Sequence, residues 1–146
     1  MANEMTFRIE SKGSGMRSDV ETPNHSMVVD EPPNMGGQDT GPDPLTMMLS
    51  ALAGCENVVA AMVANEIDFD LQGIDFDISG TIDPRGLQGE EGMRPYFQTV
   101  TINAEVKTPE SPDRIEELQR ITDQRCPVYT TMEAAGVELT SNWKKA

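Results

Sequence analysis

The stretch 43–65, DPLTMMLSALAGCENVVAAMVAN, decides the fold of this 146-residue chain. Asp43 is a favoured helix cap, and Pro44 suits the first helical position, where the missing N–H of proline costs nothing. Apolar side chains then recur at spacings of three and four, which predicts a long helix from Pro44 to about Asn65 with most of its surface buried. The predicted buried residues are Leu45, Met48, Leu49, Leu52, Cys55, Val59, Met62 and Val63, widened by Ala51, Val58 and Ala61. Gly54 costs about 1 kcal/mol in mid-helix relative to Ala, so we expect another segment to pack closely there.

Three short strands are predicted before this helix. Residues 5–10 alternate apolar and polar side chains, which is the period of a half-buried strand. The Lys-Gly-Ser-Gly run at 12–15 then predicts a turn, and the chain returns through 16–22. A third strand spans 26–29. The Pro- and Gly-rich residues 31–43 predict a long surface loop.

Downstream of the helix, two alternating runs at 74–78 and 99–106 predict a hairpin, with a long polar loop at 83–95 between them. Ser111-Pro112 begins a second helix, and Cys126-Pro127 begins a third, short one.

Gly136 ends that short helix, and residues 137–143 form a last strand. The order of strands, helix, strands, helices and strand predicts one α+β domain over residues 1–146, with helices grouped against antiparallel sheet.

The composition excludes several classes of partner. Asp and Glu outnumber Lys and Arg by 25 to 11, for a net charge of −14, which disfavours binding to nucleic acid or to an anionic membrane surface. No apolar run approaches the roughly 18 residues of a membrane span, and the N-terminus lacks an export signal. We therefore expect a cytoplasmic protein with reduced thiols, in which the two cysteines do not form a structural disulfide. Two Cys and one His also fall short of the about four ligands of a zinc site, so no metal is expected.

The two cysteines occupy different local environments. Cys55 lies on the predicted buried face, where a plain core thiol is the commoner role and where a thiol is inert unless a positive group stands beside it. Cys126 precedes Pro127 at a helix N-terminus, where free N–H groups favour a thiolate. This position predicts a lowered pKa and makes Cys126 the more activated thiol, although a cap without redox function is the alternative.

Together, these segments resemble the OsmC/Ohr family, the osmotically inducible and organic hydroperoxide resistance proteins. The resemblance covers nearly the whole chain. The motifs that carry it are Asp30-Glu31-Pro32, Gly36-Gly37, Gly41-Pro42-Asp43, Pro44-Leu45, the run LSALAGC at 49–55 and Cys126-Pro127-Val128.

The resemblance implies an OsmC-like fold in which two chains intertwine into a homodimer with active sites at the interface. It implies that Cys55 attacks a small organic hydroperoxide and becomes a sulfenic acid, and that Cys126 resolves it to a disulfide. An external dithiol of the dihydrolipoamide type then restores the thiols, and no cofactor is bound. Arg17 matches the arginine that activates the first cysteine in the family.

One position departs from the family. Its peroxidases carry a glutamate after the proline that begins the central helix, whereas this chain has Leu45 and Thr46. Glu56 lies about 100° around the helix from Cys55 and is a weak substitute. This departure favours an alternative function, a non-peroxidatic relative that binds a small apolar or thiol-bearing ligand at the dimer interface. A purely structural cysteine pair is a third possibility. In the first two cases Met48, Leu52 and Met62 share the helix face of Cys55 and are candidates to line the pocket, although packing in the core is the commoner role for such side chains.

Overall fold

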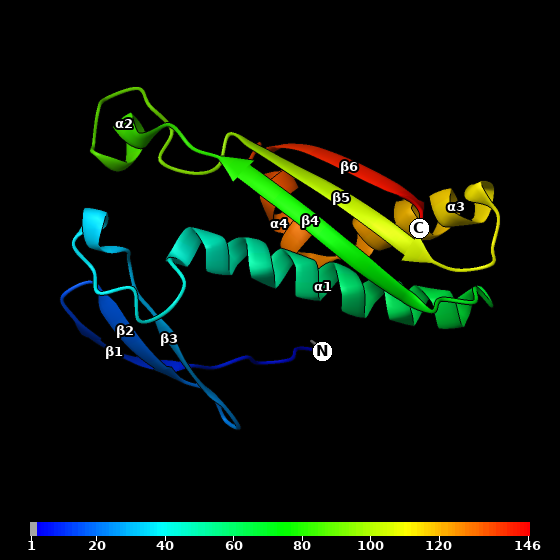
Figure 1. The fold of residues 1–146 in the computed structure, drawn as a ribbon, viewed down its shortest axis with the longest axis horizontal. Helices are drawn as coiled ribbons and strands as arrows, with labels where there is room; N and C mark the ends of the chain where they lie inside the picture. The colour runs from blue at the N-terminus through cyan, green and yellow to red at the C-terminus, as the bar shows by residue number, and fades with distance from the viewer. Residues whose placement is uncertain (1–2) are drawn as a thin grey trace. The chain divides into compact units, whose positions relative to one another are not determined.

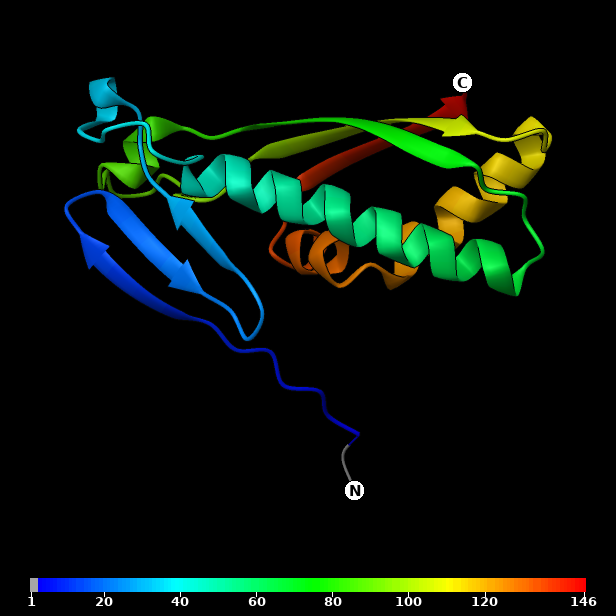
Figure 2. The same cartoon turned by 60° about the horizontal axis from the view of Figure 1, so that its bottom comes forward.

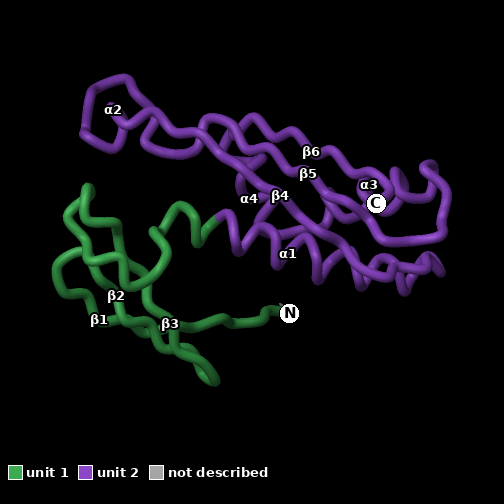
Figure 3. Tube along the Cα trace, in the orientation of Figure 1, with its two compact units in different colours: residues 1–48 green, residues 49–146 purple. Residues whose placement is uncertain are grey.

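The computed structural model describes residues 3–146 and divides the chain into two compact units, residues 1–48 and 49–146 (Figure 3). Each unit contains one three-stranded sheet. The elements of the first unit are β1 (Glu10–Ser14), β2 (Arg17–Glu21), β3 (Ser26–Val29), the short 3-10 helix η1 (Pro33–Met35) and the first residues of α1 (Pro44–Glu66). The second unit continues α1 and adds β4 (Gly73–Thr81), α2 (Pro84–Leu87), β5 (Thr99–Lys107), α3 (Pro112–Arg125), α4 (Pro127–Ala134) and β6 (Glu138–Lys145).

The sheet of the first unit is an antiparallel meander in the order β1-β2-β3. The predicted first strand was placed too early. The chain turns at Gly15, whose φ of +60° suits glycine, so pairing begins at Ser14 with Arg17 and runs back only to Glu10. Lys12 and Gly13, predicted to form the turn, therefore lie in the strand. The alternating apolar side chains before β1 are exposed: Met5, Phe7 and Ile9.

The loop before α1 is organised around the buried carboxylate of Asp30. This carboxylate accepts hydrogen bonds from the backbone N–H of Glu31, Gln38 and Thr40 at 2.8, 3.3 and 3.0 Å, and from the Thr40 hydroxyl at 2.6 Å. These bonds stabilise the charged form and lower the pKa of Asp30 to about 2. Position 37 of the loop requires glycine, because a Cβ there would lie 1.9 Å from the Glu31 carbonyl oxygen.

Helix α1 begins as the sequence predicts. The Asp43 carboxylate accepts hydrogen bonds from the backbone N–H and the hydroxyl of Thr46, at 2.9 and 2.6 Å, which satisfies the first turn of the helix. The predicted buried face of the helix is confirmed only in part, since Leu52, Val59 and Val63 are buried and Leu49 and Cys55 are half-buried. The buried residues are Leu52, Glu56, Val59, Ala60, Val63 and Ala64. Several residues of the predicted face are exposed instead: Leu45, Met48, Ala51, Val58, Ala61 and Met62. Only about one side of α1 is therefore buried within the chain.

The packing expected at Gly54 is also absent, since a Cβ built there meets nothing within 4 Å. Apolar residues surround almost the whole helix, so periodicity alone could not choose the buried side.

The sheet of the second unit has the order β4-β5-β6. The predicted hairpin is confirmed, because β4 and β5 pair antiparallel along their full length, from Gly73 with Lys107 to Thr81 with Thr99. The prediction of a wholly antiparallel sheet was wrong, since β6 runs parallel to β5. Two consecutive parallel strands need a long crossover, and α3 and α4 provide it.

Helices α1, α3 and α4 lie on the same face of this sheet (Figures 1 and 2). Inward-facing residues of β5, such as Val100 and Ile102, form one core with Leu52 of α1, Leu118 of α3 and Met132 of α4. This packing brings the middle of α1 together with the junction between α3 and α4.

By length and composition alone, α1 is the one helix among the described residues that is able to cross a membrane, with a mean hydropathy of 1.6 over 18 residues. The expectation that no apolar segment reaches this length was therefore wrong. A core helix has the same composition, and Leu52, Val59 and Val63 of α1 pack into the core of the second unit.

Candidate functional site

Cys126 lies at the junction between α3 and α4. It caps α4, since its Sγ accepts a hydrogen bond from the backbone N–H of Tyr129 at 3.4 Å and Pro127 occupies the first helical position. Its own N–H donates to the Thr122 carbonyl oxygen at 2.9 Å, which ends α3. The predicted capping position of Cys126 is confirmed.

The two cysteines come together. The Cys126 thiol is fully buried and lies within hydrogen-bonding reach of the Cys55 thiol, which α1 presents half-buried. Both are free thiols in this structure. Residues 71 positions apart in the chain therefore form one thiol pair, and it lies wholly within the second unit.

The expected lowering of the Cys126 pKa was wrong. Burial and the neighbouring Cys55 thiol raise the pKa of Cys126 to about 12, and the Glu56 carboxyl adds to the rise. The backbone N–H of Tyr129 acts in the opposite direction, as a helix N-terminus should, but it is outweighed. Desolvation of a sulfur with no exposed surface is the larger effect. Cys126 is thus a protonated thiol at neutral pH.

Sequence reasoning dismissed the most unusual residue of the site, Glu56, as a weak substitute for the family glutamate. Its side chain is fully buried, and neither carboxyl oxygen makes a hydrogen bond of ordinary geometry within residues 3–146. Asp123 and Cys126 lie beside it at interaction distance. Burial, followed by the Asp123 carboxyl, raises the pKa of Glu56 to about 9, so Glu56 is neutral at pH 7.

Asp123, on α3, also belongs to this cluster of titratable side chains around Glu56. One of its carboxyl oxygens, Oδ1, is also buried without a hydrogen-bond partner in the described chain. Tyr129 on α4 completes the set, and burial together with Asp123 raises the pKa of its hydroxyl to about 12. The titratable groups near one another here are thus two thiols, two carboxyls and a phenol, of which the Cys126 thiol and the Glu56 carboxyl are fully buried and the others half-buried. Within residues 3–146, no group of three or more His, Cys, Asp or Glu side chains is placed to hold a metal ion.

Arg17, the predicted activating residue, lies on β2 in the first unit, whereas both cysteines are in the second. Its guanidinium binds the Asp19 carboxylate through two hydrogen bonds, of 2.9 and 3.3 Å. These bonds raise the pKa of Arg17. Residues two apart on a strand share a face, so Asp19 supplies an acidic partner for Arg17 in a chain whose first turn of α1 has no acidic residue.

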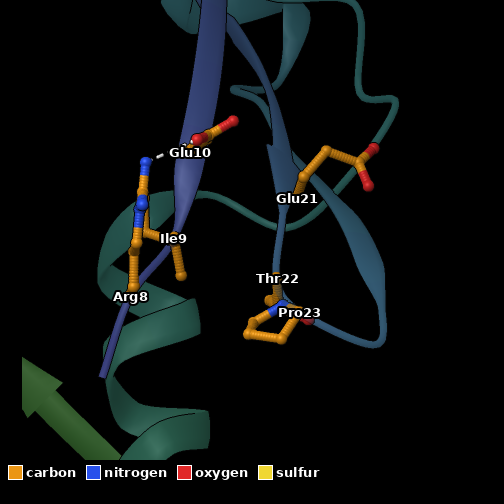
Figure 4. Close-up of a pocket in the computed structure, with 6 residues that line it drawn as sticks. All are labelled: Arg8, Ile9, Glu10, Glu21, Thr22 and Pro23. Carbon is orange, nitrogen blue, oxygen red and sulfur yellow. Dashed lines mark hydrogen bonds and ion pairs between the residues drawn. The ribbon is translucent and has the colours of Figure 1, made fainter. Parts of the chain in front are cut away.

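The residues predicted to line a pocket at the dimer interface differ in their exposure. Leu52 is buried in the core, whereas Met48 and Met62 are exposed. A surface pocket of about 250 Å³ lies in the first unit, beside the exposed ion pair of Arg8 with Glu10 (Figure 4). It contains neither cysteine.

The fold agrees with comparisons with known proteins. The model of the family of OsmC-like proteins matches residues 37–142, which include both cysteines. The chain belongs to the OsmC family. No curated protein matches the sequence.

Solved structures of other OsmC-family proteins share the fold. The OsmC-like protein of Mycoplasma pneumoniae superposes with a TM-score of 0.83 at 18% identity, over 98% of this chain and 99% of that one. An organic hydroperoxide resistance protein from Legionella pneumophila superposes with a TM-score of 0.75 at 17% identity, over 96% and 97%. The organic hydroperoxide resistance protein OhrB of Bacillus subtilis gives a TM-score of 0.68 at 17% identity, over 96% and 98%. At these identities the likeness concerns the fold.

Proposed function

We propose that this OsmC-family protein is a thiol-dependent peroxidase that reduces organic hydroperoxides through Cys55 and Cys126. The Cys55 sulfur attacks the peroxide oxygen, which gives a sulfenic acid and an alcohol. The Cys126 sulfur then attacks the Cys55 sulfur, which gives a disulfide and water. An external dithiol reduces this disulfide and is itself oxidised.

The observation that carries the proposal is the contact between the two thiols. A half-buried thiol is accessible to a small peroxide, and a fully buried thiol within reach of it is placed to resolve the sulfenic acid. No other pair of cysteines exists in the sequence. The unequal exposure supports Cys55 as the peroxidatic residue. The family resemblance alone suggests Arg17 as its activating cation.

We also propose that the protein acts as a homodimer. Helix α1 exposes apolar side chains, among them Val58 at 58% and Met62 at 52% exposure. A second copy of the chain that packs against α1 would bury them. The substrate would then reach Cys55 at the edge of this contact. A reducing compartment such as the cytoplasm suits the cycle, because it keeps the dithiol reductant supplied.

The test is a thiol titration. The reduced protein is treated with one equivalent of cumene hydroperoxide, and free thiols are counted after quenching. We expect the loss of two thiols per chain, abolished in Cys55→Ser, and a trapped sulfenic acid on Cys55 in Cys126→Ser. Survival of both thiols in excess hydroperoxide contradicts the proposal. A sulfenic acid on Cys126 in the Cys55→Ser protein reverses the two roles.

The second candidate function is binding of a small apolar or thiol-bearing ligand without peroxide chemistry. The specific observation in its favour is the start of α1, where Leu45 and Thr46 stand in place of the acidic residue of the family's peroxidases. This candidate predicts that the thiols survive hydroperoxide while an apolar fluorescent probe binds the dimer and is displaced by a small thiol.

A further inference from the structure

The buried carboxyls beside the thiol pair have no structural explanation. Glu56 is fully buried, and both of its oxygens lack a hydrogen-bond partner in the described chain, although burying an unpaired polar group costs free energy. Its oxygens therefore make no hydrogen bond in the described chain that would stabilise the helix, the sheet or a loop. Its neighbours are Asp123, Cys126 and Cys55, so the carboxyl points into the reactive centre.

Resolution of a sulfenic acid needs a base at this position. A thiol attacks as its thiolate, and a thiol with a pKa of about 12 is ionised in only about one molecule in 10⁵ at pH 7. The hydroxide that leaves the Cys55 sulfur also needs a proton. One group must therefore take a proton from Cys126 and return a proton to the leaving oxygen.

We propose that the Glu56 carboxyl takes the proton of Cys126 and returns a proton to the leaving oxygen during disulfide formation. A protonated carboxyl has one oxygen that donates a proton and one that accepts a proton, and neither oxygen of Glu56 has a hydrogen-bond partner in the described chain. The S–H proton of Cys126 passes to the unprotonated oxygen of Glu56 as the proton on the other oxygen leaves.

The electrons and atoms of the step balance. The Cys126 sulfur forms the S–S bond, the S–O bond of the Cys55 sulfenic acid breaks, and the departing hydroxide takes a proton from Glu56 to become water. Glu56 then again holds one proton. Glu56 touches the reacting thiol and is a catalytic residue in this sense, whereas Asp123 acts through Glu56 and is a positioning residue.

This inference deepens the proposed function, but part of its test does not depend on peroxide. Dipyridyl disulfide, a neutral reagent, reacts with Cys55 and releases one equivalent of thiopyridone. Attack by Cys126 on the resulting mixed disulfide releases a second equivalent, and this second phase requires Cys126 to lose its proton. Cys126→Ser must therefore show only the first phase.

We expect Glu56→Gln to slow the second phase by about 100-fold at pH 7 and to leave the first phase unchanged, because removing a group that transfers protons in general acid–base catalysis typically costs about this much. Asp123→Asn should slow it by a smaller factor. Glu133→Gln, which removes an exposed carboxylate from the same helix as Tyr129, is the matched control and should behave as wild type.

The pH dependence of the second-phase rate distinguishes loss of proton transfer by Glu56 from a structural defect. The groups that face Glu56 are Cys55 on α1, Asp123 on α3, and Cys126 and Tyr129 at α4. In the wild type the second phase should stay fast at neutral pH, whereas in Glu56→Gln it should rise tenfold per pH unit, as for an unassisted thiol. Equal second-phase rates and equal pH profiles in wild type and Glu56→Gln overturn the inference. Failure of the peroxide titration, with a Glu56-dependent second phase, overturns only the proposed peroxidase function.

Discussion

The Glu56 carboxyl and the Cys126 thiol lie side by side where α1 meets the start of α4, and neither side chain has any exposed surface. The Glu56 carboxyl disfavours a thiolate at Cys126, because two negative charges in a dry site repel each other. In the opposite direction the Cys126 thiol lowers the pKa of Glu56, but burial and the Asp123 carboxyl outweigh this effect. Glu56 and Cys126 therefore both hold their protons at neutral pH, and in the proposed peroxidase cycle Cys126 loses its proton as it reacts.

The protonated state of Cys126 predicts slow alkylation. At pH 8, iodoacetamide should modify Cys126 at least about 100-fold more slowly in the native protein than in urea, because its pKa of about 12 leaves little thiolate. Peptide mass spectrometry after timed quenching measures this rate for each cysteine. Equal native and unfolded rates at Cys126 would show that its thiol is neither buried nor protonated.

The raised pKa of Glu56 predicts the pH dependence of stability. Between about pH 5 and 9 the native state keeps a proton that an unfolded glutamate has lost, so the free energy of unfolding falls as pH rises, by up to about 1.4 kcal/mol per unit. Glu56→Gln removes this slope and should be the more stable protein at pH 9.

Urea unfolding at a fixed protein concentration, at pH 6 and pH 9, measures the difference. Glu133→Gln is again the control and should keep the wild-type slope. If the free energy of unfolding of Glu56→Gln and wild type changed equally between these pH values, Glu56 would be ionised in the native protein.

Gly54 offers a test of the proposed dimer contact. A Cβ at this helical position meets nothing within 4 Å in the chain, so Gly54→Ala should stabilise the fold by about 0.5–1 kcal/mol through helix propensity. Chemical unfolding and sedimentation together measure this change. Loss of the dimer in Gly54→Ala would instead locate the second copy directly over Gly54.

The proposed activation by Arg17 predicts a kinetic effect. Arg17→Met should slow sulfenic acid formation on Cys55 by about 10-fold, measured by stopped-flow with cumene hydroperoxide in the Cys126→Ser background. Arg85→Met is the matched control, because Arg85 also binds a neighbouring aspartate, Asp83, through its guanidinium. Unchanged kinetics in Arg17→Met would assign the activation of Cys55 to another group.

Much of the local structure follows from short sequence signals. Asp43-Pro44 begins α1, Ser111-Pro112 begins α3, and Cys126-Pro127 begins α4, because a capping side chain followed by proline marks a helix start. The alternation in β4 and β5 likewise predicts both strands and their pairing. The presence of two cysteines and their family motif were also readable from the sequence.

The tertiary structure decided the rest. The sequence of α1 is apolar on nearly all sides, so only packing against β5, α3 and α4 selects the face that contains Glu56. The same packing buries Cys126 and reverses the pKa shift expected from its helix N-terminus, because desolvation outweighs one N–H hydrogen bond. The sequence by itself thus determined which residues begin the helices and which two thiols the chain carries. The fold determined which side of α1 faces inward, and with it the protonation of the site.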